Sequence, residues 1–185
     1  MRTIEFKENG YYLLSNSGQS DQKIFRAGED FTRFLFLILY LQSPVPIYNS
    51  AWYTLQFIKK GSYPPIQKTK SILKERSVEL CAFSVSPNKF ELVVRNLTEG
   101  YLSVYMHRVL TAYSKYFNAK YQSRGHVFSG PFDCKSLSTG EINEVVKKIH
   151  TDGPSEWSSK EDYATKNRWG DLLCVKHSST KHSKS

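Results

Sequence analysis

The hydrophobic pattern of the first part of the chain predicts one strand and one buried helix. Apolar and aromatic residues run from Tyr11 to about Asn16 and end in turn-forming residues, which favours a strand. A second run, from Phe31 to Leu41, is apolar on nearly all sides, which is typical of a helix buried in a core. Glu29 and Asp30 precede this run and suit the N-terminus of a helix. We therefore expect a short strand followed by a core helix.

A hairpin pattern and a long helical pattern follow. Residues 78–85 and 89–96 alternate between apolar and polar positions around the turn sequence Ser-Pro-Asn, which predicts two paired strands. Between residues 98 and 122 apolar positions recur every three or four residues, which predicts one long helix. That helix is expected to bury one stripe of side chains: Leu102, Tyr105, Val109, Ala112 and Tyr116.

The last part of the pattern is weaker. A loop that begins at Gly125 leads into another strand, and a short helix follows that Thr139 and Glu141 are expected to cap. Residues 156–173 have a weaker helical pattern. The resulting order is strand, helix, strand, strand, helix, strand, helix, which predicts a ferredoxin-like α+β fold with helices packed on an antiparallel sheet.

The same pattern divides the chain into one domain and two polar stretches. Residues 1–175 are expected to form a single domain, because 185 residues suffice for one substantial core. Residues 43–76 are rich in proline and lysine and are interpreted as an insertion, in which one or two helical turns near residues 67–76 are expected. Residues 176–185 form a basic, serine-rich tail that has nothing to bury and is expected to be disordered.

The charge and the composition indicate which class of partner the protein binds. The chain has 26 Lys and Arg against 17 Asp and Glu, a formal net charge of +9, and 14% aromatic residues. A basic, aromatic-rich domain favours a polyanionic partner, with nucleic acid first. The alternative is a basic protein whose charge serves only solubility.

The cysteines and the apolar runs bear on the cellular location and on membrane association. Cys81, Cys134 and Cys174 lie far apart, which argues against a disulfide framework or a structural zinc site and favours a reducing, cytoplasmic location. The N-terminus has no apolar signal region. The apolar run that ends at Leu41 is much shorter than the roughly 20 residues of a membrane helix. No membrane association is expected.

Five motifs, in order, resemble those of the HUH single-tyrosine transposases, especially the REP-associated branch. The chain has YYLLSNSGQSDQKIF where that family has YYHVYNRG, six residues and F; EDFTRFL where it has EDY-x-RFL; and a hairpin with SPNKFELVV where it has MPNHVHLL. GHVFSGPF stands for the family's GHLFQGRF, and EWSSKEDY for its WSSY segment. The resemblance spans residues 11–163 apart from the insertion and implies the family's fold.

The resemblance also implies a chemistry. In that family two histidines, two positions apart on a strand, hold Mg²⁺ or Mn²⁺ over a phosphate of single-stranded DNA, and a tyrosine on a later helix attacks it. The enzymes recognise hairpins formed by palindromic repeats. The two histidine positions correspond to Lys89 and Glu91, and the tyrosine position corresponds to Lys148.

These replacements predict a degenerate site without a metal cofactor. An ammonium group 4 Å from a divalent cation is repelled by roughly 8 kcal/mol at an effective dielectric constant of 20. Glu91 alone is a poor metal site, and the Lys148 side chain cannot form a phosphotyrosine. We therefore expect a catalytically inactive, domesticated transposase-like protein.

Three functions follow, in order of preference. The first is binding of single-stranded or hairpin DNA, or RNA, through Lys89, Lys148, Arg108, Lys115, Lys120 and Arg124. The second is a protein-interaction subunit of a larger complex. The third is an active transposase or nuclease with a non-standard site, using Glu91 and another tyrosine such as Tyr113, Tyr116 or Tyr121; packing of these tyrosines against the sheet is the simpler interpretation. Either a monomer or a homodimer is compatible with the sequence.

Overall fold

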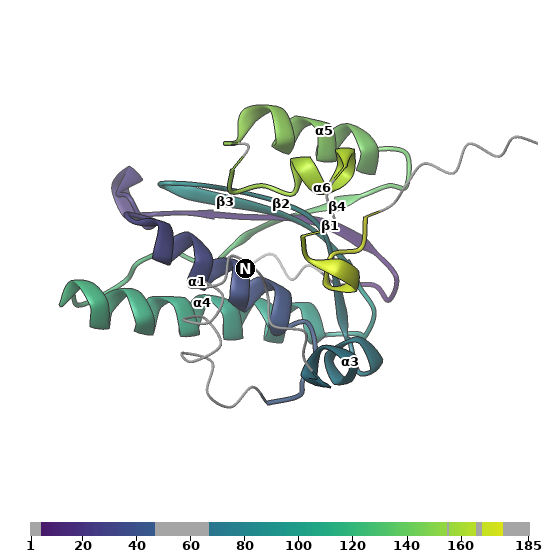
Figure 1. The fold of residues 1–185 in the computed structure, drawn as a ribbon, viewed down its shortest axis with the longest axis horizontal. Helices are drawn as coiled ribbons and strands as arrows, with labels where there is room; N and C mark the ends of the chain where they lie inside the picture. The colour runs from purple at the N-terminus through teal and green to yellow at the C-terminus, as the bar shows by residue number, and fades with distance from the viewer. Residues whose placement is uncertain (1–4, 47–66, 155, 166–167, 176–185) are drawn as a thin grey trace, which may run out of the picture.

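The computed structural model describes residues 5–46, 67–154, 156–165 and 168–175 (Figure 1). The four strands and the main helices follow one another in the order that the sequence predicts. The elements are β1 (Tyr11–Ser17), η1 (Gln19–Asp21), α1 (Gly28–Tyr40), α3 (Gln67–Lys74), β2 (Val78–Ser86), β3 (Lys89–Asn96), α4 (Tyr101–Tyr121), β4 (Asp133–Leu137), α5 (Ile142–Asp152), α6 (Lys160–Ala164) and η2 (Gly170–Leu172).

The strands form one antiparallel sheet in the order β2-β3-β1-β4. This is the ferredoxin-like arrangement, and the predicted α+β fold class is confirmed. Helices α1 and α4 cover one face of the sheet, whereas α5 and α6 lie over the opposite face (Figure 1). A side chain on a central strand therefore faces one of two helical layers.

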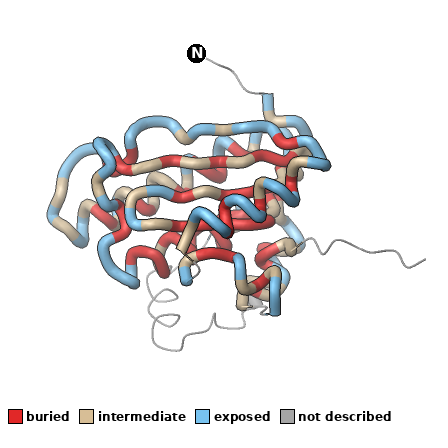
Figure 2. Tube along the Cα trace, turned by 90° about the horizontal axis from the view of Figure 1, so that it is seen from above, coloured by how far each residue is buried: buried red, intermediate tan, exposed pale blue. Residues whose placement is uncertain are grey.

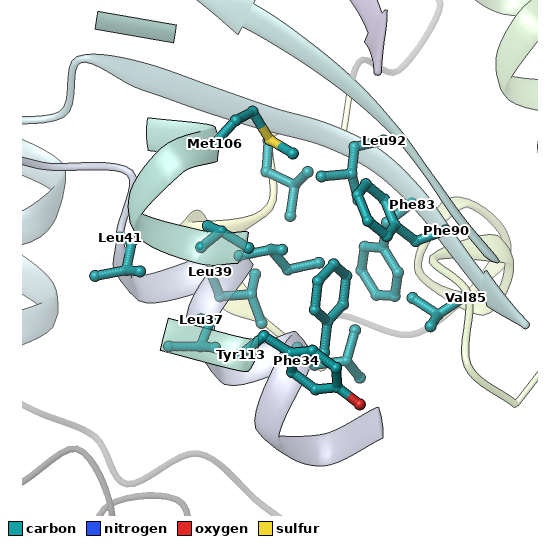
Figure 3. Packing of buried hydrophobic residues seen from close by; sticks show 14 of the residues in the cluster. Phe34, Leu37, Leu39, Leu41, Phe83, Val85, Phe90, Leu92, Met106 and Tyr113 are labelled. Carbon is teal, nitrogen blue, oxygen red and sulfur yellow. The ribbon is translucent and has the colours of Figure 1, made fainter. Parts of the chain in front are cut away.

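The two faces carry two separate apolar clusters because strand side chains alternate with a period of two. Phe90, Leu92 and Val94 of β3 pack into the large cluster beneath α1 and α4. Val93, which lies between them, packs into a smaller cluster with Ile149 of α5. Figure 3 shows residues of the large cluster, and Figure 2 shows that buried positions gather in the central strands and the helices packed on them.

The N-terminus of α1 is fixed by one buried carboxylate. The Asp30 side chain is 0% exposed, and its Oδ2 atom accepts hydrogen bonds from the backbone amides of Arg26 (2.8 Å) and Ala27 (2.9 Å). These amides precede the helix and have no intrahelical acceptor. The helix therefore begins at Gly28, earlier than the apolar run alone indicates.

Helix α5 begins differently from the sequence-based expectation. Glu141 is the N-cap residue, and its Oε2 atom accepts hydrogen bonds from the backbone amide (2.9 Å) and the hydroxyl (2.7 Å) of Ser138. The expected position of Glu141 at the start of this helix is confirmed, whereas Thr139 is not the N-cap residue; the residue that contacts the Glu141 carboxylate is Ser138, three residues earlier.

The described part of the predicted insertion contains α3, which confirms the helical turns expected there. Ile72 of this helix is 1% exposed and belongs to the large core cluster. Residues 47–66 of the insertion and the tail at 176–185 lie outside the described residues.

The outer edge of β2 is covered by the chain that follows α5. The Val85 amide donates to the Trp157 carbonyl (3.0 Å), and the Ser159 amide donates to the Phe83 carbonyl (3.0 Å). Ser159 Oγ also lies 2.7 Å from His150 Nε2, and both residues are buried. An edge strand protected in this way presents fewer free backbone groups for aggregation.

His150 makes the stability of this region depend on pH. Burial and the positive charge of Lys160 lower the pKa of His150 to about 4, against the opposing effect of Asp162. Because the folded pKa lies below the ordinary 6.5, the contribution to stability is complete above pH 6.5 and is lost as the pH falls towards 4. We expect the free energy of unfolding to fall by about 2–3 kcal/mol over this range.

Urea unfolding at several pH values tests this expectation, with His150→Gln as the comparison. The glutamine can still contact Ser159 but does not titrate, so the pH dependence between 6.5 and 4 should flatten. An unchanged slope in the variant would assign the titration to another group.

Candidate functional site

Strand β3 presents two of the three replaced positions on one face of the sheet. Lys89 and Glu91 are two residues apart and point to the side opposite Phe90, towards the layer of α5. Lys89 Nζ lies 3.3 Å from Glu91 Oε2, and the two side chains are 46% and 22% exposed. A solvent-exposed ion pair of this kind stabilises a fold by no more than about 1 kcal/mol.

The third position comes from α5, which crosses the same face. Lys148 and Glu91 line one hollow of about 310 Å³ between the helix and the sheet. Its lining residues are Leu13, Glu91, Lys135, Glu141, Glu144, Val145, Lys148 and Ile149. We call this the α5 hollow. Tertiary structure thus brings together Glu91 and Lys148, which are far apart in sequence. Lys89 contacts Glu91 through the ion pair but does not line the hollow.

Charges in the α5 hollow are balanced rather than basic. Its lining contains three glutamates, and Lys135 Nζ lies 3.3 Å from Glu141 Oε1. Hydrogen bonds from Ser138, followed by the contact with Lys135, lower the pKa of Glu141 to about 2, so this group is ionised at neutral pH. The hollow therefore does not concentrate positive charge.

The donor set does not fit the divalent metal that the resemblance implies. Glu91 is the one carboxylate left at the two ligand positions, and its partner is an ammonium group. Within the described ranges, no three His, Cys, Asp or Glu side chains gather as metal ligands. Oxygen-loving cations need several such ligands.

Tyrosine hydroxyls on α4 are engaged as donors. Tyr113 donates to the Ile24 carbonyl (2.6 Å), while Tyr116 (2.9 Å) and Tyr121 (2.6 Å) donate to the carboxylate of Asp30. The pKa of Tyr116 is raised to about 12, and burial is the largest cause of this increase. Burial also raises the pKa of Tyr113. A raised pKa disfavours the phenolate that acts as a nucleophile.

The other predicted binding residues lie on or just after α4, on the opposite face of the sheet. Lys120 Nζ contacts Asp30 Oδ1 (2.7 Å) and Glu29 Oε2 (2.9 Å), and Arg108 Nη1 donates to the Ser43 carbonyl (2.7 Å). Lys115 and Arg124 are exposed. The six predicted nucleic-acid contacts therefore form two groups on opposite faces rather than one surface.

Sequence patterns missed part of the α5 hollow. Lys135, Glu141 and Glu144 line it, and no motif distinguished them from solvent-exposed charges.

The sequence predicted the total positive charge of the chain but not where that charge lies in space. All acidic residues lie in the described part of the chain, whereas several basic residues lie outside it: Arg2, Lys59, Lys60, Lys166, Lys176, Lys181 and Lys184.

Comparisons with known proteins identify the fold. No protein-family model matches the chain, and no curated protein matches it significantly. Among solved structures, the chain is similar to a REP-associated tyrosine transposase bound to a REP hairpin. The TM-score is 0.54 at 12% sequence identity, and the match covers 100% of this chain and 98% of the other. The transposase fold expected from the motifs is thus supported over the whole length.

No helix in the described part of the chain is both long and apolar enough to cross a bilayer.

Proposed function

We propose that this protein binds single-stranded or hairpin nucleic acid and does not cleave it. The observation that carries the proposal is the Lys89–Glu91 ion pair on β3, at the positions where the resemblance requires two metal ligands. Lys148 stands beside Glu91 in the α5 hollow, where the resemblance requires the nucleophilic tyrosine. The scaffold is retained while the three reacting positions differ.

Two chemical requirements of the transposase reaction are unmet by these side chains. A metal ion that polarises the phosphate needs ligands that attract it, and Lys89 repels a divalent cation. A covalent intermediate needs a hydroxyl nucleophile, and the Lys148 ammonium supplies none. The α4 tyrosines that could replace it donate to Ile24 and Asp30.

Nucleic-acid binding is supported by fold and charge together. The similar transposase is bound to a hairpin, and the present chain has a net charge of +9. Basic side chains that neutralise phosphates release counterions, so binding should weaken steeply with salt. DNA and RNA differ in the 2′-hydroxyl, and both are included as ligands in the test.

One gel experiment tests the proposal. Labelled hairpins with single-stranded flanks, as DNA and as RNA, are mixed with the purified protein with and without Mn²⁺. We expect a shifted band on a native gel that is indifferent to Mn²⁺ and weakens at higher salt, and an uncut probe on a denaturing gel.

The matched control is the triple variant Lys89→His, Glu91→His and Lys148→Tyr, which supplies the residue types that the resemblance requires. A Mn²⁺-dependent covalent adduct formed by the unaltered protein would contradict the proposal. Absence of any shift with every probe would also contradict it and would favour a protein partner.

A further inference from the structure

A second concave region runs along α4, on the face of the sheet opposite the α5 hollow. One hollow of about 890 Å³ lies between α4 and the loop at residues 125–131, and another of about 380 Å³ lies between α4 and α1. Thr111 and Lys115 line both, so the two hollows adjoin at these side chains of α4. We call the two hollows together the α4 groove.

The α4 groove is lined by positive and polar groups without a carboxylate. Neither hollow has an Asp or Glu among its lining residues, whereas the α5 hollow has three glutamates. The basic and histidine side chains of the groove are Arg33, His107, Arg108, Lys115 and His126. The linings of these two hollows thus contain positive side chains and no carboxylate, whereas the lining of the α5 hollow contains charges of both signs.

Helix geometry arranges these groups in a row. His107, Thr111 and Lys115 are spaced four residues apart, so they lie on one side of α4 with about 6 Å of rise between neighbours. Lys115 is exposed and forms no ion pair with the described residues. Arg108 is held in place through Nη1, which donates to the Ser43 carbonyl and to Tyr101 Oη, both at 2.7 Å.

The wall opposite α4 is fixed before any ligand arrives. Phe128 forms a bridge with Gly18 at the end of β1, and the Ser129 amide donates to the Ser17 carbonyl (2.9 Å). Gln22 Nε2 donates to the Val127 carbonyl (3.2 Å). A preformed wall reduces the conformational entropy lost on binding.

The larger hollow combines apolar walls with groups that can hydrogen-bond to a base. Its apolar lining comes from Leu110, Val127, Phe128 and Pro131, and its polar lining includes Gln19, Ser114, Asn118 and Ser129. Concave apolar sites with a few polar groups are typical of small planar ligands. Grooves that bind single strands place cations along the phosphates.

We infer that the α4 groove, and not the α5 hollow, binds an unpaired segment of nucleic acid. Lys115 and Arg108 contact its phosphates, and an unpaired base enters the hollow beside Phe128. The inference rests on the proposed function and gives it a location. An acidic peptide would also meet the positive charge; nucleic acid is favoured because the structurally similar transposase is bound to a hairpin.

Two charge reversals on exposed helical lysines test the location. Lys115→Glu lies in the α4 groove, and Lys148→Glu lies in the α5 hollow; each changes the net charge by the same amount. Fluorescence anisotropy with a labelled single-stranded oligonucleotide, as DNA and as RNA, measures the affinity of the full chain. We expect Lys115→Glu to weaken binding about tenfold and to reduce the salt dependence, and Lys148→Glu to change it less than about twofold.

A second variant tests the hollow without changing charge. Ser114→Phe places a bulky ring in the space assigned to the base and should weaken binding at unchanged thermal stability.

Three outcomes would contradict these proposals. If the unaltered protein binds no oligonucleotide, the proposed function itself is contradicted. Binding that Lys148→Glu weakens as much as Lys115→Glu would contradict the location and leave the function standing. Tight, Lys115-dependent binding of a poly-glutamate peptide, with weak binding of oligonucleotides, would overturn the assigned ligand.

Discussion

Replacing Asp30 with asparagine is expected to lower the free energy of unfolding by about 3–5 kcal/mol. The carboxylate is fully buried and accepts five hydrogen bonds. Besides the amides of Arg26 and Ala27, these come from Tyr116 Oη (2.9 Å), Tyr121 Oη (2.6 Å) and Lys120 Nζ (2.7 Å). An amide in this position turns NH₂ towards some of these donors and leaves the Lys120 ammonium without its buried counter-charge.

The effect of this substitution should depend on pH. Burial by itself raises the pKa of Asp30, but hydrogen bonds from Lys120, Tyr121, the Arg26 amide and Tyr116 outweigh it, so the pKa lies below the ordinary 3.8. A lowered folded pKa means that the stabilisation is complete above pH 3.8 and is lost as the pH falls through the folded value. The difference between the unaltered protein and the variant should therefore narrow in acid.

Chemical denaturation at neutral and acidic pH measures both effects, and Glu29→Gln is the matched control. Glu29 contacts the same lysine, Lys120, at 2.9 Å, but its side chain is 59% exposed. Exposed ion pairs contribute little, so this control should change the free energy of unfolding by less than about 1 kcal/mol. Equal effects of the two substitutions would show that the burial of Asp30 is energetically unimportant.

Replacing Gly153 with alanine is expected to destabilise the protein by about 2–3 kcal/mol. A Cβ atom at this position would lie 1.7 Å from Ser84 Oγ and 3.0 Å from both Ser84 Cβ and the Ile149 carbonyl oxygen. Rotation of the Ser84 hydroxyl relieves only the first of these contacts. The segment after α5 would have to move away from β2, and the backbone contacts of Trp157 and Ser159 with that strand would weaken.

Thermal unfolding compares this variant with Gly140→Ala and with a double variant. A Cβ atom at Gly140 meets no atom within 4 Å, so that substitution should be nearly neutral. Adding Ser84→Ala to Gly153→Ala removes the closest contact and should restore part of the lost stability, as for residues that are coupled by contact. A Gly153→Ala protein as stable as Gly140→Ala would show that the segment shifts at negligible cost.

Hydrophobic periodicity predicted most of the secondary structure because burial on one face leaves a period in the sequence. The long run of three- and four-residue spacings predicted α4, and alternation predicted β2 and β3 close to their observed bounds. Alternation did not predict the bulge between Leu80 and Ala82, which lets Cys81 and Ala82 both contribute to the cluster beneath α5. A bulge is a local backbone irregularity that apolar residues on both sides of a strand conceal.

The sequence by itself determined the order of the elements and the replacement of the three reacting positions. Both are properties of residue identity and spacing. Only the tertiary structure decided where the distant charges act: it placed Lys148 in a hollow that contains three glutamates, and it brought Lys120 within 2.7 Å of Asp30. It also placed His107 and Lys115 in a groove without carboxylates. Electrostatic interaction depends on distance and burial in space, and separation along the chain fixes neither of them.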